Sequence, residues 1–160
     1  MDWDAYMRIV RIGFWLAWMT WAMAAHASGP EAKVILTSGE EKKVLACLPL
    51  EAGHSIRLEF INSIYLAPVR ETFLYQPGEG LVLVEVDSPS AGVFEYYGLP
   101  FEKSGTVIMR RNVGQEIRLL SSDYQNHRLI VGERSLPLKG LVADGEPLIV
   151  RVQRGGRCGL

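Results

Sequence analysis

The chain has 160 residues, of which 48% are hydrophobic and 22% are charged, and its formal net charge is −1. This composition excludes a disordered chain and a collagen-like chain, and the balance of 17 basic against 18 acidic residues excludes a basic nucleic-acid-binding protein. All four tryptophans lie within the first 21 residues, which separates the N-terminus from the rest of the chain.

The first 27 residues have the pattern of an export signal. Arg8 and Arg11 precede a run of 14 uncharged residues, Ile12–Ala25, and Ala25-His26-Ala27 matches the pattern after which a signal peptidase cuts. The run is shorter than the roughly 20 residues that span a bilayer comfortably. We therefore predict a cleaved signal peptide over residues 1–27, with an uncut N-terminal anchor helix or a buried globular helix as the alternatives.

Residues 28–160 are predicted to form a single all-β domain. Short runs of alternating apolar and polar residues recur along this segment, broken by Gly, Pro and Asn, and no run has apolar residues at helical spacing. We expect an antiparallel β-sandwich or barrel of eight to ten short strands. The predicted strands are Val34–Leu36, Val44–Leu48, Ser55–Phe60, Val69–Tyr75, Leu81–Val86, Thr106–Arg110, Glu116–Leu120, His127–Val131, Ser135–Leu138 and Leu148–Val152.

Two cysteines lie near opposite ends of this domain. In an oxidising compartment Cys47 and Cys158 could form a disulfide that closes a long loop. The alternative is a buried Cys47 within an apolar run and a separate thiol in a glycine-rich tail. The sequence leaves both interpretations open, because nothing in it fixes the geometry that a disulfide needs.

A carboxylate stands out on the apolar face of one predicted strand. In the strand Val69–Tyr75, period-two alternation puts Glu71 on the face that carries Val69, Phe73 and Tyr75. A charged group there must meet a partner or become protonated, because an unpaired buried charge is costly. Glu71 is therefore a candidate ligand-facing residue. The structural interpretation is that it hydrogen-bonds backbone or an arginine near a strand end.

Asn62 and Ser63 are predicted to lie close to Glu71. If Ser55–Ser63 and Val69–Tyr75 form a hairpin, Asn62, Ser63 and Glu71 cluster at one end of it. The more common role of Asn and Ser at a strand end is to cap the turn by bonding local backbone. The sequence is compatible with both roles.

The segment Asp87–Ser104 is the longest interruption between predicted strands, and we expect it to be an irregular loop with a function. Within it, Tyr97 offers a flat amphipathic surface, Gly98 permits positive φ and Pro100 fixes the exit. These residues either bind a ligand or partner, or the tyrosines pin the loop to the domain. Further on, His127 opens an apolar strand, where a histidine is either a ligand-binding residue or, more often, hydrogen-bonded structure.

The motifs of common enzymes are missing from the sequence. It contains no H-E-x-x-H, no C-x-x-C, no P-loop and no G-x-S-x-G motif. We therefore predict a protein that is not an enzyme and that has no metal and no cofactor. A hydrolase that uses Ser63, His127 and Glu71 as a dispersed triad is the enzymatic alternative.

Together these residues resemble one family. Asn62-Ser63, then Pro68-Val69 with Glu71, then Gly98-Leu99-Pro100, then His127 before an apolar strand, is similar to the small exported family catalogued as domain of unknown function 1850. Members show His-Ser, Pro-Val-x-Glu, a Gly-x-Gly-x-Pro loop and a later histidine. Here Asn62 replaces the usual histidine, and Tyr96 replaces the first glycine of the loop.

The resemblance implies a role in transport. The family is often encoded beside permeases of TRAP transporters that use TAXI-type solute receptors. We therefore expect an exported accessory or binding protein, in the periplasm or on the outer face of the cytoplasmic membrane, whose partner is the permease or its receptor. The alternative is a stand-alone periplasmic β domain that binds a small ligand.

Overall fold

The computed structural model describes residues 32–122, 124–155 and 158. The predicted signal peptide, residues 1–27, lies outside the described residues. Within the described part of the chain, no helix is long and apolar enough to cross a membrane.

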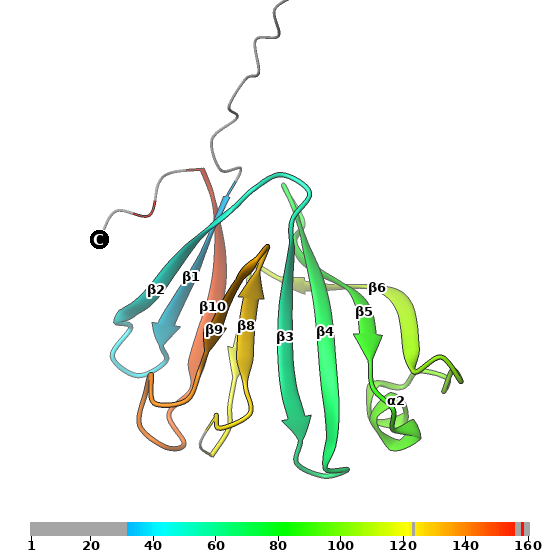
Figure 1. Ribbon diagram of the computed structural model, residues 1–160. Coiled ribbons are helices and arrows are strands. Elements are labelled where there is room, and N and C mark those ends of the chain that lie inside the picture. The colour runs from blue at the N-terminus through cyan, green and yellow to red at the C-terminus, as the bar shows by residue number, and fades with distance from the viewer. Residues whose placement is uncertain (1–31, 123, 156–157, 159–160) are drawn as a thin grey trace, which may run out of the picture.

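Ten strands form two antiparallel sheets (Figure 1). One sheet has four strands in the order β2-β1-β10-β7, and the other has six in the order β6-β5-β4-β3-β8-β9. Neither sheet closes on itself. The strands are β1 (Ala32–Ser38), β2 (Val44–Leu50), β3 (Ser55–Asn62), β4 (Ala67–Gln76), β5 (Gly80–Asp87), β6 (Thr106–Gly114), β7 (Glu116–Leu119), β8 (Arg128–Val131), β9 (Arg134–Pro137) and β10 (Leu148–Arg154).

One hydrophobic core is shared by the two sheets. Alternation along β1 buries Val34 and Leu36, and alternation along β3 buries Ile56 and Leu58, so each sheet presents an apolar face to the same cluster. The sheets are also linked through the backbone, because β6 ends at Gly114 and β7 begins two residues later in the other sheet. Away from this link, a cavity opens between the two sheets.

The predicted antiparallel all-β fold is confirmed. Each of the ten predicted strands overlaps an observed strand, and the predicted hairpin is β3 paired with β4, with Asn62 opposite Ala67. The connection is the four-residue turn 63–66, whose last residue, Leu66, has a positive φ of 50° and is 79% exposed.

The segment between β5 and β6 is where the prediction was wrong. It is not wholly irregular, because residues Ala91–Tyr97 form the helix α2. Val93 and Phe94 of this helix are completely buried, and Tyr97 packs against the core. Seven residues give fewer than two full repeats of the helical period, which is too short for the spacing to be recognised in the sequence.

The two cysteines are joined by a disulfide. Cys47 lies on β2, Cys158 follows β10, and their Cα atoms are 5.6 Å apart. In the sheet, β1 lies between β2 and β10, so the disulfide links the segment after β10 to β2, the strand on the far side of β1.

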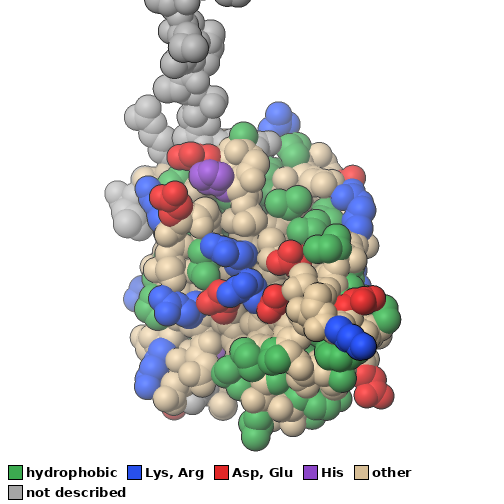
Figure 2. Space-filling model, turned by 45° about the vertical axis from the view of Figure 1, so that its right-hand side comes forward, with side chains coloured by type: hydrophobic (Ala, Val, Ile, Leu, Met, Phe, Trp, Pro, Cys, Tyr) green, Lys and Arg blue, Asp and Glu red, His purple; other side chains and the backbone are tan. Residues whose placement is uncertain are grey.

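The outer face of the six-stranded sheet carries charged side chains. Figure 2 shows acidic and basic groups intermingled in the middle of the surface. By register, Glu59 of β3 stands beside Arg128 of β8 and Arg70 of β4, and Arg70 stands beside Asp87 of β5. Arg70 Nε donates to Glu59 Oε1 at 2.9 Å. Opposite charges therefore alternate across four strands, as expected of a solvated sheet face.

Candidate functional site

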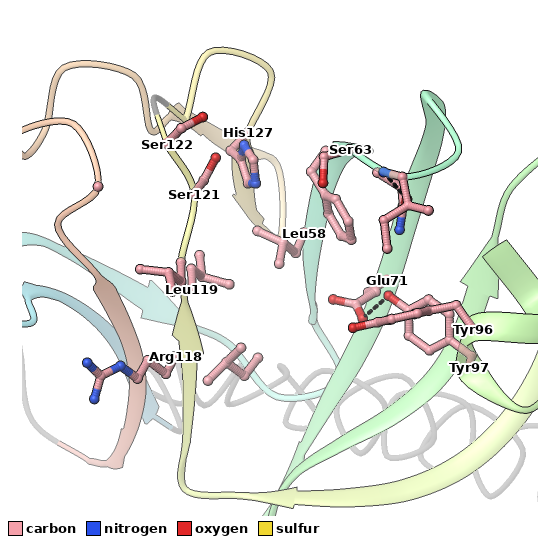
Figure 3. Close-up of a pocket in the computed structure, with 16 residues that line it drawn as sticks. Leu58, Ser63, Glu71, Tyr96, Tyr97, Arg118, Leu119, Ser121, Ser122 and His127 are labelled. Carbon is pink, nitrogen blue, oxygen red and sulfur yellow. Dashed lines mark hydrogen bonds between the residues drawn. The ribbon is translucent and has the colours of Figure 1, made fainter.

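A cavity of about 840 Å³ opens between the two sheets, at the end of the molecule that carries the β3–β4 turn (Figure 3). β3 and β4 form one wall, β7 and the residues after it form the facing wall, and α2 reaches in from the side. The lining residues are Leu58, Phe60, Asn62, Ser63, Ile64, Glu71, Tyr96, Tyr97, Ile117, Arg118, Leu119, Leu120, Ser121, Ser122, His127 and Gly145.

Five of the seven predicted binding residues line this cavity. They come from the β3–β4 hairpin, from the helix α2 and from the residue before β8, and they are Asn62, Ser63, Glu71, Tyr97 and His127. The other two, Gly98 and Pro100, are not among the lining residues. Gly98 is the C-cap of the helix that carries Tyr97, and Pro100 follows two residues later.

Glu71 and Tyr97 are hydrogen-bonded to each other in the cavity wall (Figure 3). Tyr97 Oη donates to Glu71 Oε1 at 2.6 Å. Burial raises the pKa of the Glu71 carboxyl, and the bond from Tyr97 acts in the opposite direction. Burial also raises the pKa of the Tyr97 hydroxyl, and the neighbouring Glu71 charge raises it further. The partner of Glu71 is therefore a tyrosine, rather than the backbone or arginine of the structural interpretation.

The end of α2 fixes the position of Tyr97. Gly98 follows it with φ of 67°, and its N–H donates to Glu95 O, while the N–H of Leu99 donates to Phe94 O. A glycine in this left-handed conformation is a common helix terminator. Arg111 Nη2 also donates to the carbonyl oxygen of Tyr97 at 3.1 Å. The role of Gly98 is thus to end the helix one residue after the tyrosine that meets Glu71.

Asn62 caps the β3–β4 turn. Its Oδ1 accepts hydrogen bonds from the N–H groups of Ile64 and Tyr65, each at 3.0 Å. This is the turn-capping role predicted as the more common one. Because the side-chain oxygen accepts the hydrogen bonds of the turn, the amide N–H₂ group is the part of Asn62 that can donate a hydrogen bond to a ligand in the cavity. Ser63, the next residue, is exposed at the rim.

His127 stands at the cavity edge immediately before β8. Its ring stacks on Phe60 with centroids 5.6 Å apart, and Tyr124 meets it edge-on at 5.3 Å. The buried hydroxyl of Tyr124 lies 2.9 Å from the carbonyl oxygens of both Leu119 and Glu146, and its one proton can be donated to either. These contacts connect His127, the end of β7 and the turn before β10 into one side of the cavity.

The facing wall was not identified as part of a site from the sequence. It consists of three residues of β7 and the three residues that follow, namely Ile117, Arg118, Leu119, Leu120, Ser121 and Ser122. The strand itself was predicted, but nothing in one sequence indicates which strand of the other sheet it faces. Figure 3 shows Leu119 opposite Leu58, with Ser121 and Ser122 near His127 at the mouth.

Ser63, Glu71 and His127, the three residues of the dispersed triad, all line the cavity, and the hydrogen bond described for the Glu71 side chain is the one from Tyr97. Metal-ligating side chains are scattered, because the described residues contain no group of three or more His, Cys, Asp or Glu that could hold an ion. What the arrangement offers is a cavity lined by both apolar and polar groups, with a partly buried carboxyl on one wall and hydroxyl, amide and imidazole groups at its mouth.

No protein family model, curated protein or solved structure matches this chain. The resemblance to domain of unknown function 1850 therefore stays a prediction, based on the short motifs around Asn62, Glu71 and Gly98.

Proposed function

We propose that the protein is an exported, non-enzymatic binding protein that holds a small molecule in the cavity between its sheets and serves a TRAP-type solute transporter. The observation that carries the proposal is the meeting of Asn62, Ser63, Glu71, Tyr97 and His127 in one cavity. Small-molecule sites are typically mostly apolar cavities of about 300–1,000 Å³ with a few polar groups that orient the ligand. The cavity has that size, and its lining combines aliphatic and aromatic side chains with a larger share of polar groups.

Two further observations support export and the transport role. The disulfide between Cys47 and Cys158 supports an oxidising compartment, because disulfides persist in the periplasm and are rare in the cytosol. The family resemblance supports a partnership with the permease or its receptor. The two-sheet arrangement is, in this proposal, a β-sandwich that is open at the end where the ligand enters.

A small-molecule assay tests the cavity. We would purify the protein from its native cells under mild conditions and look for a bound compound by native mass spectrometry. Ser63→Trp places a large ring at the mouth, while Ser104→Trp makes the same change at an exposed serine outside the cavity. We expect a bound compound in the wild type and the Ser104 variant but not in the Ser63 variant. Equal occupancy in all three proteins would place binding elsewhere.

A crosslinking pull-down tests the transport role. The tagged protein would be crosslinked mildly in its native membranes and its partners read by mass spectrometry. Recovery of a TRAP permease or its receptor is the expected result. The second candidate function is a stand-alone ligand-binding domain, because one chain forms the whole cavity. A bound compound, with neither the permease nor its receptor recovered, would favour that function.

A further inference from the structure

The partly buried carboxyl of Glu71 faces the cavity without a counter-ion among the described residues. Its described hydrogen bond is the one from Tyr97, to Oε1, and none of the described ion pairs includes it. Arg118 is a cationic lining residue, but Figure 3 shows its guanidinium pointing away from Glu71. A buried anion is costly unless it is paired, so this wall of the cavity is suited to a positively charged group.

Two tyrosine rings lie beside this carboxyl (Figure 3). Tyr97 donates to Glu71, and the rings of Tyr96 and Tyr97, which both line the cavity, meet edge to face with centroids 5.7 Å apart. The faces of such rings attract cations, and the attraction grows where water is excluded. A carboxylate with aromatic neighbours is a combination that favours an ammonium group over a neutral or anionic one.

Aliphatic side chains face the cavity from both walls. Leu58 of β3 is 4% exposed and Leu119 of β7 is 8% exposed, and Figure 3 shows them facing each other from the two sheets. Ile117 adds a third aliphatic side chain to the lining. This part of the cavity can bury a hydrocarbon or aromatic body through the hydrophobic effect.

We propose that the cavity binds an organic cation, an amine or quaternary ammonium compound with an apolar body, and that Glu71 is its counter-ion. The inference rests on the proposed small-molecule function and names its ligand class. In the complex, the cationic group lies against Glu71 and the rings of Tyr96 and Tyr97, and the apolar body lies between Leu58 and Leu119. Tyr97 keeps the carboxylate oriented through its hydroxyl.

Four matched probes test the ligand class. Benzyltrimethylammonium and 2-phenylethylammonium carry a positive charge, 2-phenylethanol is neutral and phenylacetate is negative, while each has one benzene ring. Binding would be measured at neutral pH by the rise in melting temperature and by calorimetric titration. We expect the two cations to bind at least tenfold more tightly than the other two. An equal or greater effect of 2-phenylethanol or phenylacetate would overturn the cation inference and leave the small-molecule function standing.

Two variants locate the charge. Glu71→Gln keeps the shape and a hydrogen-bond acceptor for Tyr97 but removes the charge. Glu95→Gln removes a charge from an exposed position on α2, the helix that carries Tyr97. We expect the Glu71 variant to lose at least tenfold in affinity for the cations and the Glu95 variant to bind as the wild type does. Unchanged affinity in the Glu71 variant, or no response to any probe, would overturn the inference, whereas the proposed function is judged separately by the compound bound in native cells.

Discussion

Replacing Tyr97 by Phe tests whether the hydrogen bond to Glu71 stabilises the domain in a pH-dependent way. The change removes the hydroxyl that donates to Glu71 Oε1 at 2.6 Å and leaves the ring in place. A hydrogen bond to a charged group contributes about 1.5–3 kcal/mol, and one between neutral groups about 0.5–1.5 kcal/mol. The expected cost is therefore about 1.5–3 kcal/mol where Glu71 is ionised and about half of that where it is protonated.

The sign of the pH dependence follows from linkage. Burial raises the pKa of Glu71 in the folded protein above its value in the unfolded chain. The stability that this group contributes is therefore lost as the pH rises from the unfolded pKa through the folded pKa. The bond from Tyr97 lowers the pKa of Glu71, so its removal raises that pKa further. The variant must then lose additional stability relative to the wild type as pH increases.

Urea denaturation at pH 4, 6 and 8 measures this effect. The neighbouring Tyr96, which is 64% exposed, provides the control, and Tyr96→Phe should change the free energy of unfolding by less than about 0.5 kcal/mol at each pH. A cost of Tyr97→Phe that is the same at all three pH values, or larger at pH 4, would refute the assigned role of the hydrogen bond.

Three further changes have expected outcomes in thermal or urea unfolding. Replacing both Cys47 and Cys158 by serine should cost about 2–5 kcal/mol, because the disulfide spans 111 residues; a loss below about 1 kcal/mol would contradict this. Gly98→Ala should cost about 1 kcal/mol, since φ of 67° is unfavourable for a side chain even where space is free, and an unchanged melting temperature would argue against the strain. Leu66→Gly should stabilise the domain by up to about 1 kcal/mol by relieving φ of 50° at an exposed position, and a clear destabilisation would mean that Leu66 makes contacts that matter.

The strands could be predicted because their signal is local. Alternation along β3 and β4, with turn residues between them, indicates both the hairpin and the face on which Glu71 lies. The helix α2 could not be predicted, because the burial of Val93 and Phe94 is decided by packing against strands far away in the sequence.

One half of the candidate site could likewise be predicted from the sequence, and the other half could not. The half formed by Asn62, Ser63 and Glu71 could be predicted, because one hairpin brings these residues together. The half formed by Leu119 and Ser121 could not, because it depends on how one sheet packs over the other. The hydrogen bond between Glu71 and Tyr97 joins residues 26 apart in the chain through a helix that no local pattern indicated.

The pairing of the first and last strands determines at which end of the domain the preceding segment of the chain is attached. Ala32, where β1 begins, is paired with Arg154, where β10 ends, and Figure 1 places this pair at the end of the molecule opposite the β3–β4 turn. Whatever precedes Ala32 in the chain therefore joins the domain at the end away from the cavity. If the protein is held at a membrane through that segment, its point of attachment to the domain and the mouth of the cavity lie at opposite ends of the domain.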